Sequence, residues 1–110
     1  MLTISVDGSG ETAVVRLAGE VDLNVSPQLR ARLKELVREG RKKIIVDMAG
    51  VPYIDSSGVA TLVECLQGVS RYGGKLRLAA LGNRTRGVFE ISRLDTVFSI
   101  HQTVEEALRA

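Results

Sequence analysis

Short apolar runs alternate with amphipathic segments over most of this 110-residue chain. The runs at residues 43–47, 75–81 and 97–100 predict buried strands, and the segments between them carry apolar residues at helical spacing. Parallel strands need a long crossover connection, which is usually a helix and almost always right-handed. The alternation therefore predicts a mostly parallel sheet with helices packed on it.

Two strands are predicted before this alternation begins. Residues 3–6 alternate polar and apolar side chains, residues 12–18 resume a strand, and Gly8-Ser9-Gly10 between them is turn material. This order predicts an N-terminal β-hairpin.

Residues typical of helix ends help to delimit four helices. We expect Ser26-Pro27 to open the first, because serine can cap free N–H groups and proline tolerates the first helical position. The second follows residue 58, the third lies within residues 88–94, and the last opens at Thr103 with a capping-box spacing. The predicted order is β-β-α-β-α-β-α-β-α, a single α/β domain over residues 1–110 with a mixed, mostly parallel sheet of about five strands and four helices.

Composition restricts the class of protein. The single cysteine, Cys65, excludes an internal disulfide, and its place between Leu62 and Leu66 predicts a small packing residue. No apolar stretch reaches the roughly 18–20 residues that a membrane-spanning helix needs, and the first residues lack the pattern of a secretion signal. We therefore expect a cytoplasmic protein that does not insert into membranes.

Basic residues gather between positions 30 and 43, although the formal net charge of the chain is only +2. Glu35 and Glu39 interrupt the run, and aromatic residues that would stack on bases are missing from it. The run is therefore interpreted as the solvated face of a helix and its exit loop, with no direct nucleic-acid partner expected.

The chain lacks the residue sets of common catalytic and cofactor sites. Its only histidine, His101, is expected in a surface loop, and one histidine with one cysteine cannot form the usual transition-metal sites. There is no Gly-x-Ser-x-Gly nucleophile motif and no Walker-type phosphate loop. We expect no enzymatic activity, no metal and no other cofactor.

One junction concentrates the remaining chemistry. Asp55-Ser56-Ser57-Gly58, called the junction below, lies between a predicted strand and a predicted helix. It places two hydroxyls and a carboxylate at a helix start, where backbone N–H groups lack partners and negative charge is favoured. The residues suit simple helix capping, and they also suit a serine that accepts a phosphate.

The junction and the residues before it, Val46-Asp47-Met48-Ala49-Gly50-Val51-Pro52-Tyr53-Ile54, resemble the signature of bacterial anti-sigma factor antagonists, which are STAS domains. Leu17-Ala18-Gly19-Glu20-Val21-Asp22-Leu23 is similar to the second landmark of that family. The resemblance covers nearly the whole chain. It implies a regulator of transcription that acts by binding other proteins.

The resemblance also implies a partner and a switch. An anti-sigma factor serine kinase with a histidine-kinase-like ATPase fold would bind the unphosphorylated chain, phosphorylate Ser56 and then release it, and a separate serine phosphatase would reset it. Phosphate adds about −1.5 to −2 charges beside Asp55, which would oppose burial of the junction in an interface.

The resemblance implies partner contacts at Asp22 and at all four residues of the junction. Alternatives stay open for several of them: Asp55 can itself be the helix N-cap, Ser57 can make only a local hydrogen bond, and Asp22 and Glu20 can be surface turn residues.

Two other functions remain open from the sequence. The same domain can serve as an unswitched scaffold in a lipid-transport assembly or a stressosome-like signalling complex. A nucleotide-binding or nucleotide-hydrolysing protein is the third hypothesis, and the missing phosphate loop argues against it.

Overall fold

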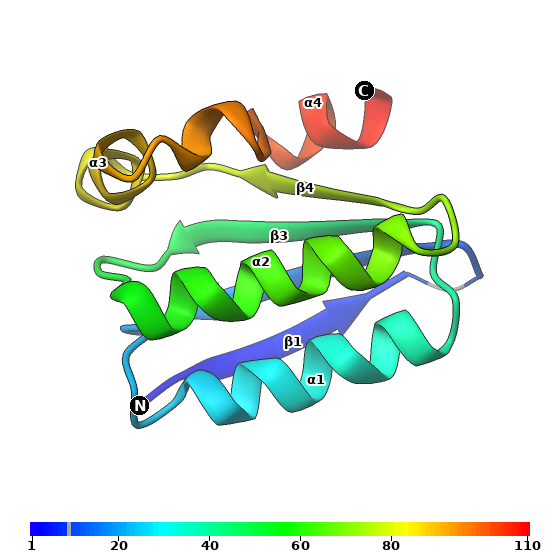
Figure 1. The fold of residues 1–110 in the computed structure, drawn as a ribbon, viewed down its shortest axis with the longest axis horizontal. Helices are drawn as coiled ribbons and strands as arrows, with labels where there is room; N and C mark the ends of the chain where they lie inside the picture. The colour runs from blue at the N-terminus through cyan, green and yellow to red at the C-terminus, as the bar shows by residue number, and fades with distance from the viewer. Residues whose placement is uncertain (9) are drawn as a thin grey trace.

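A five-stranded mixed sheet forms the centre of the molecule, and its strands lie side by side in chain order (Figure 1). The computed structural model describes residues 1–8 and 10–110. The first two strands form an antiparallel hairpin, and each later strand pairs in parallel with the one before it. The strands are β1 (Thr3–Asp7), β2 (Thr12–Ala18), β3 (Lys43–Gly50), β4 (Lys75–Ala79) and β5 (Ser99–His101).

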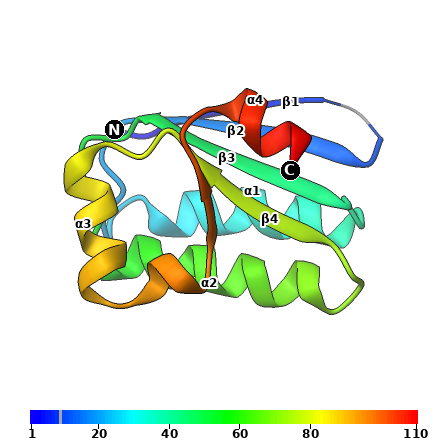
Figure 2. The same cartoon turned by 90° about the horizontal axis from the view of Figure 1, so that it is seen from above.

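Two long helices cover one face of this sheet and a short helix covers part of the other (Figure 2). Successive parallel strands are added in one direction, so right-handed crossovers bring their helices to the same face. The last helix follows the final strand and needs no crossover, which leaves it free to fold back onto the opposite face. The helices are α1 (Ser26–Arg38), α2 (Ser56–Ser70), α3 (Asn83–Ile91), the 3₁₀ turn η1 (Leu94–Thr96) and α4 (Val104–Arg109).

Side-chain alternation along the strands separates two apolar clusters. Ile44 and Val46 of β3 belong to the large core beneath α1 and α2, whereas Ile45 packs with Ala107 of α4 on the other face. The large core is mainly aliphatic, with one edge-to-face aromatic pair between Phe89 and Phe98 at a centroid distance of 5.5 Å.

The predicted order of strands and helices is confirmed, and so is the hairpin, whose Ser9 lies outside the described residues. Thr103 also caps α4 as predicted, since its hydroxyl oxygen accepts from the N–H of Glu106 at 3.1 Å. The predicted serine cap on α1 is wrong. Ser26 is a buried first residue of the helix, and the N–H groups of Ser26 and Val25 donate instead to the carbonyl of Asp22.

Backbone conformation explains other differences between the predicted and the observed element boundaries. The strand expected over 75–81 ends at Ala79, because Ala80 has a φ of 62° and leaves the extended conformation. The third helix begins earlier than expected and ends at Ile91, before Arg93 turns the chain with a φ of 63°. His101 is the last residue of β5, so its expected loop position is wrong.

Cys65 is buried, as its spacing predicted. Burial raises the pKa of its thiol to about 12. At neutral pH the side chain is therefore an uncharged packing group with very little thiolate.

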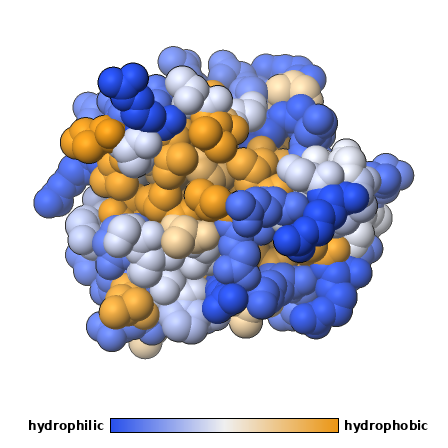
Figure 3. All heavy atoms as spheres, in the orientation of Figure 1, coloured by the Kyte–Doolittle hydropathy of each residue, from blue (hydrophilic) through white to orange (hydrophobic). Residues whose placement is uncertain are grey.

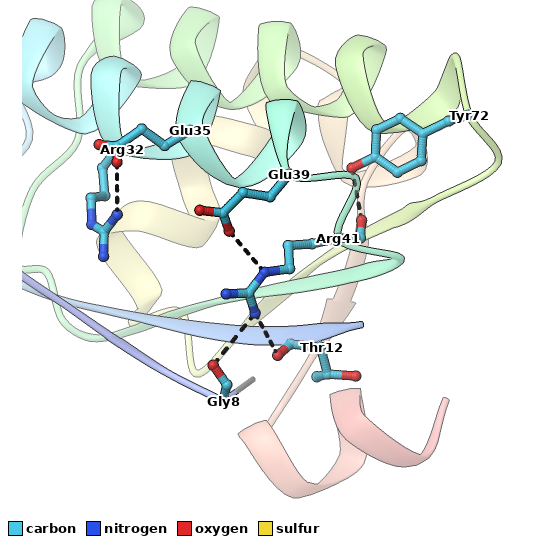
Figure 4. Close-up of polar contacts among 7 residues, drawn as sticks. All are labelled: Gly8, Thr12, Arg32, Glu35, Glu39, Arg41 and Tyr72. Carbon is cyan, nitrogen blue, oxygen red and sulfur yellow. Dashed lines mark hydrogen bonds and ion pairs between the residues drawn. The ribbon is translucent and has the colours of Figure 1, made fainter. Parts of the chain in front are cut away.

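Arg41 departs from the picture of a solvated basic face (Figure 4). Its guanidinium donates to the carbonyls of Gly8 and Thr12 and pairs with Glu39, while its own carbonyl accepts from the hydroxyl of Tyr72. It thus ties the end of the first hairpin to the segments that follow α1 and α2.

No helix in the described part of the chain has the length and apolar character needed to cross a membrane.

Candidate functional site

The site is assembled where the loops that follow β2 and β3 meet. Val21 and Ile54 form an isolated parallel bridge, in which the N–H of Val21 donates to the carbonyl of Tyr53 at 2.9 Å. The N–H of Asp55 donates to the carbonyl of Val21 at 3.0 Å. The bridge brings Asp22 and Asp55, which are distant in sequence, to the same edge of the sheet. Ligand sites of parallel sheets commonly lie at this carboxyl end of the strands.

Asp55 is the N-cap of α2. Its Oδ1 accepts from the N–H of Ser57 at 2.9 Å and from the N–H of Gly58 at 3.3 Å. The hydroxyl of Ser57 donates to the same oxygen at 2.5 Å. These hydrogen bonds, led by the one from the Ser57 hydroxyl, lower the pKa of Asp55 below its usual value. The helix start therefore already holds an ionised carboxylate.

The two serines of the junction have different surroundings. Ser57 is half-buried and its hydroxyl donates to Asp55. The local hydrogen bond considered for Ser57 is therefore present in the structure. Ser56 is the first residue of α2 and is exposed. Ser56 therefore lies at the surface, next to the Asp55 carboxylate, which already accepts hydrogen bonds from Ser57 and Gly58.

Ser56 also lines an open groove between α2 and the α3–η1 segment, with a volume of about 520 Å³. Figure 3 shows apolar surface gathered on the side of the molecule that carries α2 and α3. Helical spacing predicted a short helix within residues 88–94, and it could not reveal the groove because that depends on where η1 lies beside α2. The apolar lining consists of Val59, Ala60, Val63, Val88 and Leu94.

Gly58 is buried beneath the bridge. A Cβ at this position would lie 2.7 Å from Cγ1 of Ile54 and 2.7 Å from Cγ1 of Val21. The glycine therefore lets α2 approach the bridge closely. Direct contact of Gly58 with a partner stays a prediction.

Asp22 shapes the loop before α1. Its Oδ1 accepts from the N–H of Asn24 at 3.0 Å and from the N–H of Val25 at 3.3 Å. This turn role is the one that sequence reasoning left open, and contact of Asp22 or Glu20 with a partner stays a prediction.

Sequence reasoning missed two exposed apolar side chains in these loops. Leu23 is 72% exposed and Tyr53 is 40% exposed. Both residues belong to the two segments that resemble the STAS signature, but their exposure depends on how the two loops pair.

Side chains that could bind a metal ion are scattered over the described part of the chain. Within residues 1–8 and 10–110, no three histidine, cysteine, aspartate or glutamate side chains gather where they could hold a metal ion. Nε2 of His101 lies 2.8 Å from the hydroxyl of Ser99 at the end of β5, and Cys65 lines a small cavity of about 120 Å³ between α1 and α2. Of the two serines of the junction, Ser56 is the exposed one.

Comparison with known proteins gives matches over most of the chain. A family model described as the STAS domain matches residues 3–107. The chain is 29% identical over 99 residues to the anti-sigma-B factor antagonist of Bacillus subtilis (strain 168), covering 90% of each chain. It is 26% identical over 91 residues to the protein of the same name from Staphylococcus aureus (strain NCTC 8325 / PS 47), covering 83% of this chain and 84% of that one.

Solved structures share the fold. The anti-sigma factor antagonist SpoIIAA in its unphosphorylated form superposes with a TM-score of 0.84 at 27% identity, covering 96% of this chain and 93% of that one. The Bacillus cell fate determinant SpoIIAA in the phosphorylated form gives a TM-score of 0.76 at 28% identity, covering 97% of both chains. An anti-sigma factor antagonist from Mycobacterium paratuberculosis gives 0.91 at 24% identity, covering 99% and 92%, which shows likeness of fold.

Gly58→Ala should destabilise the protein, because the added methyl group must displace two buried side chains. We expect a loss of about 1–3 kcal/mol in the free energy of unfolding, measured by urea denaturation. Gly87→Ala is the matched control, since it lies inside α3 and nothing lies within 4 Å of the position that its added Cβ would take. That change should stabilise by about 0.5–1 kcal/mol. Equal effects of the two substitutions would contradict the close approach at Gly58.

Asp55→Ala should lower the free energy of unfolding by about 1 kcal/mol at pH 7, because α2 loses its N-cap. Asp55→Asn keeps an acceptor and should lose less. The pKa of Asp55 is lower in the folded protein, so its charged form contributes stability above the unfolded pKa, and this contribution is lost as pH falls through the folded pKa. The gap between wild type and Asp55→Ala should shrink in acid, and a gap that widens there would refute the assignment.

Proposed function

This chain belongs to the STAS domain family, and from that premise we propose that it is an anti-sigma factor antagonist controlled by phosphorylation of Ser56. Without phosphate on Ser56 it binds an anti-sigma factor serine kinase, which frees the sigma factor. Phosphorylation by that kinase causes release, and a separate serine phosphatase restores the binding form.

The observation that carries this proposal is the contrast between the two serines of the junction. Ser56 is exposed at the start of α2, whereas the hydroxyl of Ser57 is held by Asp55. A kinase needs a hydroxyl that it can surround, and Ser56 meets this requirement without unfolding of the loop. The names of the relatives and the existence of a phosphorylated SpoIIAA structure support the same assignment.

Electrostatics at the helix start explain how phosphate can oppose binding. The N–H groups of Ser57 and Gly58 could neutralise part of an added charge, but they already donate to Asp55. A phosphate on Ser56 would therefore add about −1.5 to −2 charges beside an ionised carboxylate whose nearest backbone donors are in use.

The free protein tolerates this charge because water solvates it. In a complex, a partner that covers Ser56 removes that water, and without a matching cation the desolvation costs several kcal/mol. A loss of about 3–4 kcal/mol weakens binding by two to three decades. The switch needs no large rearrangement of the domain.

The groove next to Ser56 supplies apolar surface for the complex. Burial of its lining residues gives the partner a source of affinity that does not depend on the charge state of Ser56. The phosphate then acts as an added penalty at one end of the contact area.

Phosphorylation is the direct test. Incubation with ATP and each purified anti-sigma factor serine kinase encoded in the same genome should add one phosphate, on Ser56, as measured by intact-mass and peptide mass spectrometry. Ser56→Ala should take up none, and Ser57→Ala should still be modified. Modification elsewhere, or no transfer from any of these kinases, would contradict the switch and favour the unswitched scaffold.

Binding of variants tests the electrostatic part separately. Ser56→Asp should weaken binding to the kinase by about tenfold or more, because it adds one buried negative charge, while Ser56→Ala should bind like the wild type. Isothermal titration calorimetry measures both dissociation constants. Ser70→Asp, with the same charge at the far end of α2, is the control and should have little effect. Equal affinities of Ser56→Asp and Ser56→Ala would argue against charge as the cause of release.

A further inference from the structure

Leu23 is an exposed apolar side chain on the loop that is bridged to the junction. It is 72% exposed, in the loop between β2 and α1. A single exposed leucine needs no explanation in a mobile surface loop. The surroundings of Leu23 are different, because its backbone is fixed on both sides.

The residues around Leu23 form a tight turn. The carboxylate of Asp22 accepts from the N–H groups of Asn24 and Val25, and its carbonyl accepts from the N–H of Ser26 at 2.8 Å. On the other side, Val21 is fully buried and bridged to Ile54. The loop therefore holds Leu23 in one backbone conformation, so little backbone conformational entropy remains to be lost on binding.

The same loop is joined directly to the junction. The N–H of Asp55, the residue that precedes Ser56 and caps its helix, donates to the carbonyl of Val21 at 3.0 Å, two residues before Leu23. Tyr53, 40% exposed, lies on the neighbouring loop, where its carbonyl accepts from the N–H of Val21. Two exposed apolar side chains therefore come from the two loops that position Ser56.

Any kinase that phosphorylates Ser56 must contact the surface formed by these two loops. A protein–protein contact of ordinary size buries about 800 Å² on each partner, so a contact that encloses the Ser56 hydroxyl extends well beyond it. The loop that carries Leu23 is hydrogen-bonded to Asp55 through Val21, so Leu23 falls within the reach of such a contact. Its side chain is mostly exposed before binding, so most of the area buried in the complex is newly removed from water.

We infer that Leu23 is an apolar anchor for the anti-sigma factor kinase of the proposed function, and that Asp22 acts as a positioning residue which holds Leu23 in place. The inference rests on the proposed function, because it takes the kinase that modifies Ser56 as the occupant. It assigns to Asp22 a role through the turn in place of a charge contact with the partner.

Leu23→Ala tests the anchor, with Leu108→Ala as matched control. Leu108 is a leucine of α4, on the opposite face of the sheet, and is 41% exposed. With the kinase that phosphorylates Ser56 in the wild type, Leu23→Ala should raise Kd about tenfold to hundredfold and raise KM for phosphorylation. The kcat should change by no more than about twofold. Leu108→Ala should leave all three unchanged, and both variants should unfold in urea as cooperatively as the wild type.

Asp22 is tested by a pair of substitutions. Asp22→Asn keeps an oxygen acceptor for the turn and should bind the kinase nearly like the wild type, whereas Asp22→Ala loses the turn and should bind more weakly. If both variants bind equally weakly, the charge of Asp22 contacts the partner and the positioning role is overturned. The double variant Asp22→Ala with Leu23→Ala should bind no more weakly than Leu23→Ala alone, because the turn acts through Leu23.

The outcomes separate this inference from the function on which it rests. Phosphorylation of wild-type Ser56 together with unchanged Kd and KM in Leu23→Ala overturns the anchor and leaves the switch standing. Absence of transfer to the wild type from every kinase tried overturns the proposed function, and the anchor with it.

Discussion

The bridge between Val21 and Ile54 is the interaction on which the site depends. Both side chains are buried, and their backbones link the loops that follow β2 and β3. Gly58 packs against both side chains, so the first turn of α2 is seated on the bridge. One pairing therefore fixes the helix start, its aspartate cap and the loop that precedes α1. Rigid elements of this kind hold functional groups more accurately than free loops do.

This rigidity gives the proposed switch a local character. Asp55 already occupies the N–H groups at the start of α2, so a phosphate on Ser56 meets an ionised neighbour at a helix end whose donors are taken. The change is one of charge at a surface whose shape stays the same. The groove and the exposed side chains of Leu23 and Tyr53 contribute apolar area around that charge. In the proposed function, affinity and control are therefore assigned to different groups.

The sheet order explains why these groups meet at one edge. Each parallel strand is added beside the previous one, so the loops after β2 and β3 emerge next to each other. Sequence patterns predicted the elements and their order, since strand and helix periodicities are local signals. They failed at Ser26, where an upstream carbonyl supplied the contacts expected of a serine cap, and at His101, which β5 includes. The first error is local, because Asp22 lies only four residues before Ser26, whereas the second arose because pairing with β4 extends β5 to His101.

The sequence alone determined the alternation of strands and helices and the resemblance carried by the junction, and that resemblance led to Ser56 as the residue proposed for a switch. Those conclusions depend on residue types at short spacing. Only the tertiary structure decided that Asp55 is the N-cap, that Ser57 is held by it, and that Leu23 stands exposed in the loop bridged to them. It also decided the groove between α2 and η1. The cap and its bond to Ser57 are local geometry that residue types leave open, whereas the groove and the paired loops come from contacts between segments far apart in the chain, which strand register and crossover geometry set.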